Sequence, residues 1–255
     1  MNMQTTVQRL VQAALVAVDP AQAVREAVQR QGSRLVLEGT SYDLDQYEHV
    51  YVVGGGKAGA PMAQALTEIL GARLSAGWVN VKEGHLADAS LPETLTIHEA
   101  GHPLPNAAGQ AGALRILEMV QAAGPRDLVF CLISGGGSAL LTAPARGVKL
   151  AEIQKLTADL LVCGASIDEI NTLRKHLDLV KGGGLARLAA PARLATLILS
   201  DVVGGPLDVI AAGPTVPDPT TFQDAYQVLE RYALSEHTPQ AIVKRILRCL
   251  NLFLD

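Results

Sequence analysis

The apolar positions of this chain repeat with two different periods. Short runs of Val, Ile and Leu, such as residues 50–53 and 128–133, are typical of strands buried on both faces of a sheet. Longer segments with apolar residues three or four positions apart are typical of amphipathic helices. We therefore expect strands at 50–53, 78–81, 95–98, 128–133 and 194–199. We expect helices at 5–18, 21–31, 58–70, 107–123, 150–162, 166–179, 222–232 and 239–250, with another beginning at Leu185.

Strands and helices alternate along most of the chain, and this order decides the fold class. A strand, a helix of about a dozen residues and a second strand form a right-handed βαβ unit with parallel strands. Asn106 and Gly124 fit the start and the end of one such helix, because Asn caps helix N-termini and glycine ends helices. The sequence predicts an α/β fold, a Rossmann-like three-layer sandwich with a mostly parallel sheet.

Composition and charge narrow the functional classes. A formal charge of -4 and 4% aromatic residues argue against a nucleic-acid surface, which needs basic patches and stacking rings. Three cysteines without C-x-x-C spacing argue against a disulfide framework, and we expect all three in the core. The uncharged apolar stretches are no longer than strands. We therefore expect a cytoplasmic protein without a membrane or nucleic-acid partner.

Half of the glycines, 12 of 24, fall in four clusters, and three of these clusters directly follow predicted strands. The clusters are 54–56 with 59, 135–137, 182–184 and 204–205. In an open α/β sheet the ligand crevice lies beyond the carboxyl ends of the strands, where glycine turns let backbone N–H groups approach an anion. The clusters therefore predict a phosphate or carboxylate site that includes Gly55 and Gly56.

The first glycine cluster contains a lysine, Lys57, which favours phosphoryl transfer over dinucleotide binding. Residues 54–59 formally match the G-x-G-x-x-G dinucleotide fingerprint, with Glu83 after the next strand as the ribose ligand. The Lys57 ammonium would crowd a bound pyrophosphate, but it suits a phosphoryl group in transfer. The spacing of a Walker A loop is absent. Lys57 is thus a candidate catalytic cation, and the alternative is an ordinary surface lysine beside a tight turn.

The second cluster forms a serine–glycine loop, Ser134-Gly135-Gly136-Gly137-Ser138. It ends a predicted strand and begins a helix, so we expect its N–H groups and its two hydroxyls to converge and bind an oxyanion. A nucleophile elbow does not fit, because no serine stands between suitably spaced glycines. The alternative is a purely structural turn.

Charged side chains precede the third cluster. Asn171, Arg174, Lys175 and Asp178 share one face of a predicted helix, and Lys181 follows it. Such a face can hold an anion, and the alternative is the solvated surface that charged helix faces usually form.

Two aspartates accompany the fourth cluster. Asp201 follows an apolar strand at the carboxyl edge of the sheet, where a carboxylate commonly holds a metal or a substrate hydroxyl, and Asp208 can support it. His98 and His102 are four residues apart, but the glycine and proline around His102 disfavour a helix there. We therefore expect no zinc site at these histidines.

Five segments of the chain carry recognisable motifs in one order. They are 52–59 (VVGGGKAG), 101–106 (GHPLPN), 132–141 (LISGGGSALL), 170–186 (INTLRKHLDLVKGGGLA) and 199–215 (LSDVVGGPLDVIAAGPT). Together they resemble the amino-terminal domain of glycerate 2-kinases, a family also labelled hydroxypyruvate reductases. The resemblance implies ATP-dependent phosphorylation of D-glycerate at its 2-hydroxyl to 2-phosphoglycerate, with Mg2+ as the partner of the nucleotide.

The resemblance also assigns domains and residue roles. Residues 1–235 would form the amino-terminal Rossmann-like domain, and 236–255 a helical tail leading to a second domain across the active-site cleft. Lys57 and Asp201 would be catalytic, and Asp201 and Asp208 would bind the metal. The residues expected to hold substrate or phosphate are Gly55, Gly56, Ser134, Gly135, Gly136, Gly137, Ser138, Asn171, Arg174 and Lys181.

The chain departs from the family pattern in two places. It is much shorter than family members, so a missing carboxyl-terminal domain or a second copy of the chain would complete the site. Gly205 stands where relatives usually carry an acidic residue, which weakens a metal site there.

Two other functions fit parts of the sequence. An NAD(P)-dependent hydroxypyruvate reductase fits the family label and the G-x-G-x-x-G match, although no His/Asp pair is evident as proton donor. A truncated lobe that binds ligand without turnover fits the short chain and would expose an apolar docking surface.

Overall fold

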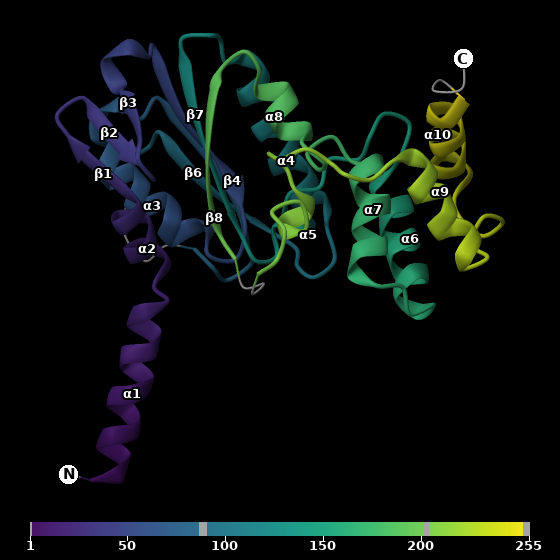
Figure 1. Ribbon diagram of the computed structural model, residues 1–255, viewed down its shortest axis with the longest axis horizontal. Helices are drawn as coiled ribbons and strands as arrows, with labels where there is room; N and C mark the ends of the chain where they lie inside the picture. The colour runs from purple at the N-terminus through teal and green to yellow at the C-terminus, as the bar shows by residue number, and fades with distance from the viewer. Residues whose placement is uncertain (1, 87–90, 201–203, 252–255) are drawn as a thin grey trace.

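A computed structural model describes residues 2–86, 91–200 and 204–251 and shows an α/β fold (Figure 1). Its central sheet has five parallel strands in the order β6-β5-β4-β7-β8. The strands are β4 (His49–Gly55), β5 (Ala76–Lys82), β6 (Leu95–Ala100), β7 (Asp127–Ser134) and β8 (Arg193–Leu199). The five predicted strands and the predicted fold class are confirmed.

The strand order places a ligand crevice at a definite point. From the central strand β4 the chain moves outward to β5 and β6, then returns to the other side of β4 to form β7 and β8. The order reverses between β4 and β7, and in doubly wound sheets ligands bind beyond the strand ends at this switch point. The glycine loops that follow β4 and β7 therefore flank the expected crevice.

The side chains of β7 show why both faces of the sheet are covered. Leu128, Phe130 and Leu132 join a core with α3 (Gly59–Leu70) on one face. Val129, Cys131 and Ile133 join a core with α4 (Ala107–Ala122) and α8 (Gly184–Ala189) on the other. Successive strand residues point to opposite faces, so a continuous apolar run requires helices on both.

The N-terminal region differs from its prediction. The expected helix at 21–31 is wrong in its second half, because α2 (Pro20–Ala27) ends where a strand begins. The antiparallel strands β1 (Val28–Gln31), β2 (Arg34–Leu37) and β3 (Thr40–Asp43) form a small sheet outside α3. Glu38 and Gly39 both have positive φ, 46° and 78°, as the two-residue hairpin between β2 and β3 requires.

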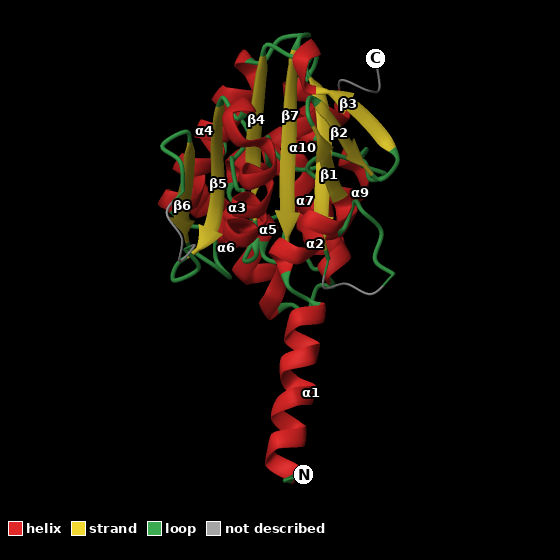
Figure 2. Cartoon of the chain, turned by 90° about the vertical axis from the view of Figure 1, so that its left-hand side faces the viewer, coloured by secondary structure: helices red, strands yellow, loops and turns green. Residues whose placement is uncertain are grey.

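Helix α1 (Met3–Ala17) stands away from the rest of the molecule (Figure 2). None of its residues is buried, and its large apolar side chains are exposed. The cysteines also differ from expectation, since only Cys131 is in the core, whereas Cys163 is exposed and Cys249 is partly exposed. No helix in the described ranges combines the length and apolarity that crossing a membrane requires.

Four helices form a third core to the right of the sheet in Figure 1. They are α6 (Leu150–Val162), α7 (Ile167–Leu177), α9 (Phe222–Arg231) and α10 (Gln240–Asn251). Ile242 and Ile246 of α10 are fully buried in this core. The C-terminal helix thus packs on α7 and α9. Short helices complete the described chain: α5 (Gly137–Leu140), η1 (Leu44–Gln46), η2 (Gly71–Arg73) and η3 (Ile210–Ala212).

Removing a buried side chain should cost stability, whereas removing an α1 side chain should not. Leu66 of α3 is 0% exposed, so Leu66→Ala should lower the free energy of unfolding by about 2–5 kcal/mol through lost burial and a cavity. The matched control Leu10→Ala, at a side chain 66% exposed, should stay within about 0.5 kcal/mol of wild type. Urea unfolding measures both, and equal losses would contradict this packing.

Candidate active site

The glycine loops after β4 and β7 touch through their backbones. A Cβ placed on Gly54 would lie 2.0 Å from the Leu132 carbonyl oxygen, and one on Gly56 would lie 2.0 Å from Ser134 Oγ. Both glycines also have φ values, 148° and 153°, that other residues rarely adopt. These two glycines are thus required by packing between the loops.

Two hydrogen bonds fix the contact between the loops. The Lys57 backbone N–H donates to the Gly135 carbonyl at 2.9 Å, and the Ala58 N–H donates to Ser134 Oγ at 3.1 Å. Ser134 is 2% exposed, so its hydroxyl lies inside the loop contact, whereas Ser138 lines a cavity. Ser134 Oγ thus accepts a hydrogen bond from the β4 loop, and the expectation that it also binds a ligand together with Ser138 stays a prediction.

The buried side-chain amide of Asn80 holds the loops in place through hydrogen bonds. Asn80 of β5 is 0% exposed and donates from Nδ2 to the carbonyl oxygens of Gly109 and Leu140 at 3.1 and 2.8 Å. Its Oδ1 accepts from Trp78 Nε1 at 3.1 Å, and its carbonyl accepts the Gly56 N–H at 3.0 Å. Asn80 therefore ties the β4 loop to α4 and α5. The signal in the sequence was an amide within an apolar strand.

Lys57 and His102 flank the open part of the serine–glycine loop. A Cβ on Gly136 would lie 3.3 Å from Lys57 Cε and 3.1 Å from His102 Nε2, so both side chains border this glycine. Burial, and then the positive charges of Lys57, Lys82 and His85, lower the pKa of His102. The half-buried imidazole is therefore held neutral near pH 7 beside an exposed ammonium group. Sequence reasoning considered His102 only as a zinc ligand and missed this arrangement.

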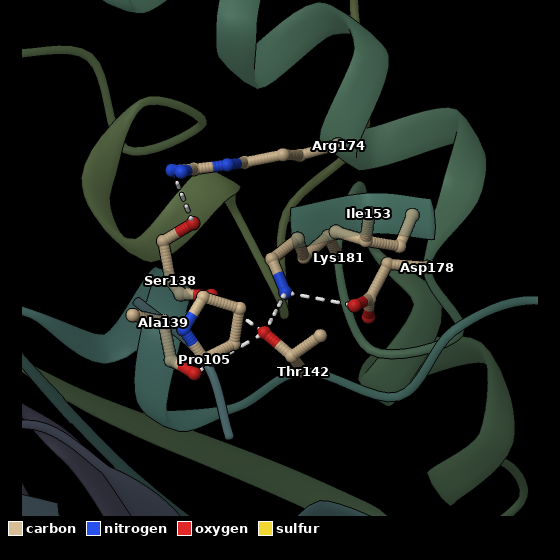
Figure 3. Close-up of a pocket in the computed structure, with 8 residues that line it drawn as sticks. All are labelled: Pro105, Ser138, Ala139, Thr142, Ile153, Arg174, Asp178 and Lys181. Carbon is tan, nitrogen blue, oxygen red and sulfur yellow. Dashed lines mark hydrogen bonds and ion pairs between the residues drawn. The ribbon is translucent and has the colours of Figure 1, made fainter. Parts of the chain in front are cut away.

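Ser138 lines a small cavity between α5, α6 and the end of α7 (Figure 3). The cavity measures about 10 Å³, which is room for about one water molecule. Its lining consists of Pro105, Ser138, Ala139, Thr142, Ile153, Arg174, Asp178 and Lys181. The cavity is therefore too small to hold an anion larger than water, and Ser138 and Arg174 both line it.

Lys181 lies in the floor of the cavity and is 2% exposed. Its Nζ lies 2.7 Å from the Leu141 carbonyl, 2.9 Å from Asp178 Oδ2 and 3.4 Å from Thr142 Oγ1. Burial lowers the pKa of Lys181, and the Asp178 carboxylate opposes this shift. All three ammonium hydrogens thus have protein acceptors. Lys181 holds the backbone beneath Ser138 in this structure and does not reach the surface.

Arg174 and Asn171 are the two α7 side chains with hydrogen-bonding groups that a ligand could use. The Arg174 guanidinium donates to Ser138 Oγ at 3.3 Å. Burial lowers the pKa of Arg174, while Asp178 raises it, and the group stays charged. Asn171 is 5% exposed, and its Oδ1 has no hydrogen-bond partner among the described residues.

The other charged side chains of the predicted site, those of Lys175 and Asp208, pair with each other and not with Ser138 or Arg174. The Nζ of Lys175 lies 2.8 Å from Asp208 Oδ2 and 3.3 Å from Asp218 Oδ1. Asp208 therefore forms an ion pair with a buried lysine through Oδ2, and its expected role beside Asp201 at a metal stays a prediction. Asp201 lies outside the described residues. Within residues 2–86, 91–200 and 204–251, no three His, Cys, Asp or Glu side chains are grouped to hold a metal ion.

Comparison with known proteins identifies the family. A family model described as a domain of unknown function, DUF4147, matches residues 6–247. The chain belongs to this family. It is 43% identical to a D-glycerate 2-kinase of Thermotoga maritima over 237 residues, which are 92% of this chain and 53% of the relative. It is 42% identical to a glycerate 2-kinase of Pyrococcus horikoshii over 95% of this chain and 53% of the relative.

Solved structures of DUF4147 relatives share the fold. A crystal structure of a Pyrococcus horikoshii protein matches with a TM-score of 0.89 and 39% identity, covering all of this chain and 57% of that one. The crystal structure of Thermotoga maritima glycerate kinase matches with a TM-score of 0.80 and 41% identity, over 94% and 53%. The resemblance to glycerate 2-kinases is confirmed. The chain spans about half the length of the curated relatives it matches.

The buried pair beneath Ser138 gives a stability prediction. Asp178→Asn should lower the free energy of unfolding by about 3–5 kcal/mol, because it leaves the Lys181 ammonium buried without a counter-charge. The control Asp159→Asn breaks the exposed pair with Lys155 and should cost at most about 1 kcal/mol. Denaturant titration compares the two variants, and a similar small loss in both would mean that the buried pair is not structural.

The positive charge of Lys57 near His102 gives an electrostatic prediction. In Lys57→Ala the pKa of His102 should rise, because a positive charge that disfavours the imidazolium has been removed. An NMR titration of the histidine ring resonances measures this pKa, with Lys155→Ala as the control. An unchanged His102 pKa in Lys57→Ala would show that the two side chains do not interact.

Proposed function

We propose that this chain is the amino-terminal lobe of a glycerate 2-kinase, which transfers a phosphoryl group from ATP to the 2-hydroxyl of D-glycerate. The observation that carries the proposal is the group of Lys57, His102 and Arg174 around the glycine loop at the sheet's switch point. The substrate is a carboxylate and the transferred group is a phosphate. Cations and backbone N–H groups aimed at one place are what such a reaction needs.

Lys57 and Asp201 are the proposed catalytic residues. In the transfer, the hydroxyl oxygen of glycerate bonds to the terminal phosphorus and the bond to the bridging oxygen of ATP breaks. ADP leaves, and the hydroxyl proton is released to solvent. The Lys57 ammonium, exposed at the loop, would neutralise charge on the phosphoryl oxygens. Asp201, which follows the β8 segment in the sequence, would orient the hydroxyl. Mg2+ bound to the nucleotide would neutralise phosphate charge.

The other predicted residues have proposed roles in binding. The N–H groups at Gly136, Gly137 and Ser138 begin α5 and would bind the substrate carboxylate or phosphate, with Arg174 opposite Ser138. Asn171, with its unpaired Oδ1, would complete this group. Lys181 would position Ser138 from below. Residues 1–235 would form the lobe, and 236–255 would lead into the remaining half seen in relatives.

A reductase is the second candidate, because a relative from Agrobacterium vitis, 46% identical over 183 residues, carries the provisional name hydroxypyruvate reductase. In a dinucleotide-binding loop the second glycine lets the backbone approach the pyrophosphate. Here the corresponding Gly56 is pressed against Ser134 Oγ. Gly56 is thus used for packing between the two loops, as well as for its backbone conformation, and this use favours the kinase.

Ligand-dependent thermal unfolding of this chain tests the proposal. D-Glycerate or MgATP at about 100 times its dissociation constant should add roughly 2.7 kcal/mol and raise the midpoint by about 5–10 °C. The shift should be smaller in Lys57→Ala, and L-glycerate and NADH serve as control ligands. A shift with NADH or NADPH alone would favour the reductase. The absence of any shift with glycerate and nucleotide would contradict a ligand site formed by this lobe.

A further inference from the structure

A wide groove lies between α10 and the connection from α5 to α6. It measures about 840 Å³ and is lined by Arg146, Gly147, Ala241, Lys244, Arg245, Arg248 and Cys249. It shares no lining residue with the cavity beside Ser138. The groove is therefore a second concave surface, separate from the candidate active site, and its volume is typical of small-molecule sites.

The charge of this groove is unlike that of the chain as a whole. The chain has a net charge of -4, yet four of the seven lining residues are cations and none is a carboxylate. Lys175 and Lys181 elsewhere are paired with aspartates. By contrast, the structure gives no ion pair for Arg146, Lys244 or Arg248 with any residue that it describes. The groove thus has uncompensated positive charge.

The fold of α10 does not require these cations. The buried face of the helix is supplied by Ile242 and Ile246, and the cations lie on the face toward the groove. Lys244 and Arg248 stand four residues apart, where like charges destabilise a helix by a few tenths of a kcal/mol. The helix dipole favours Arg248 in the last turn, but it does not account for Arg146, which lies on another element.

One guanidinium is held in position for a ligand. Arg245 is partly buried, and its Nε donates to the His176 carbonyl at 2.9 Å. Its Cζ lies 6.0 Å from the centroid of the Phe222 ring. These contacts fix the plane of the guanidinium beside a neighbouring cavity that His176 and Phe222 line, and Arg245 lines both that cavity and the groove. A preorganised arginine loses less side-chain entropy on binding an anion and matches phosphate geometry.

We infer that this groove binds a small molecule carrying at least two linked phosphate groups. Arg245 and Arg248 on one face of α10 are three residues apart, a rise of roughly 4.5 Å along the helix, so successive phosphates can meet successive cations. Arg146 closes the site from the opposite wall. The lining contains no aromatic ring to stack a base, so the polyphosphate chain is the part recognised.

Calorimetric titration of the 255-residue chain with tripolyphosphate tests the inference directly. We expect saturable binding that is at least tenfold weaker for orthophosphate and that weakens with added salt. The double variant Arg146→Ser/Arg248→Ser should lose at least tenfold in affinity. Both residues are exposed, so its thermal midpoint without ligand should match wild type. The control Arg115→Ser/Lys155→Ser removes the same charge from exposed sites elsewhere and should bind like wild type.

Three outcomes would overturn the inference. They are no binding to wild type, an equal loss in the groove and control variants, and loss in Lys57→Ala with no loss in the groove variant. The last result would place the polyphosphate at the glycine loops, and it would support the proposed kinase function. Conversely, failure of glycerate to bind would leave the groove result unaffected.

Discussion

Backbone contact between the ends of β4 and β7 is the constraint on which the candidate site depends. At Gly54 and Gly56 a side chain would overlap Leu132 and Ser134, so the close packing of the two loops requires glycine at both positions. The bond from Ala58 to Ser134 Oγ then sets where α3 begins. With these glycines used in packing, the surface left for a ligand is the turn at Gly136, bordered by Lys57 and His102.

A buried ion pair between Lys181 and Asp178 also supports the region around the Gly136 turn. The Lys181–Asp178 pair costs desolvation, and such a pair is tolerated when its remaining hydrogen-bonding groups are satisfied. Here Asp178 also accepts the N–H groups of Ala143 and Val180 at 3.0 and 2.8 Å. One carboxylate thus joins the chain after α5 to the end of α7. This joint keeps Arg174 within reach of Ser138, and both residues line the small cavity beside Lys181.

The sequence predicted those parts of the fold that depend on neighbouring residues alone. Apolar runs identified all five parallel strands, and the glycines after them located the loops at the switch point. The small sheet was missed because its four-residue strands are rich in polar residues, and the hairpin uses Glu38-Gly39 in place of the more common Asn-Gly. The sequence also could not predict which side chains contact one another. Asn80 and His102 act through residues distant in the chain, and helical spacing alone could not assign Lys175 to Asp208.

Helix α7 connects the two cationic regions of this acidic chain. On its last turns, Arg174 faces Ser138 at the candidate active site, and the carbonyl of His176 holds Arg245 at the basic groove. Lys175, between them, is anchored by Asp208 and Asp218, so the helix end cannot rotate without breaking a buried ion pair. Tight packing transmits small displacements between neighbouring groups. The positions of Arg174 and Arg245 are therefore set together by one rigid segment, although their two sites share no lining residue.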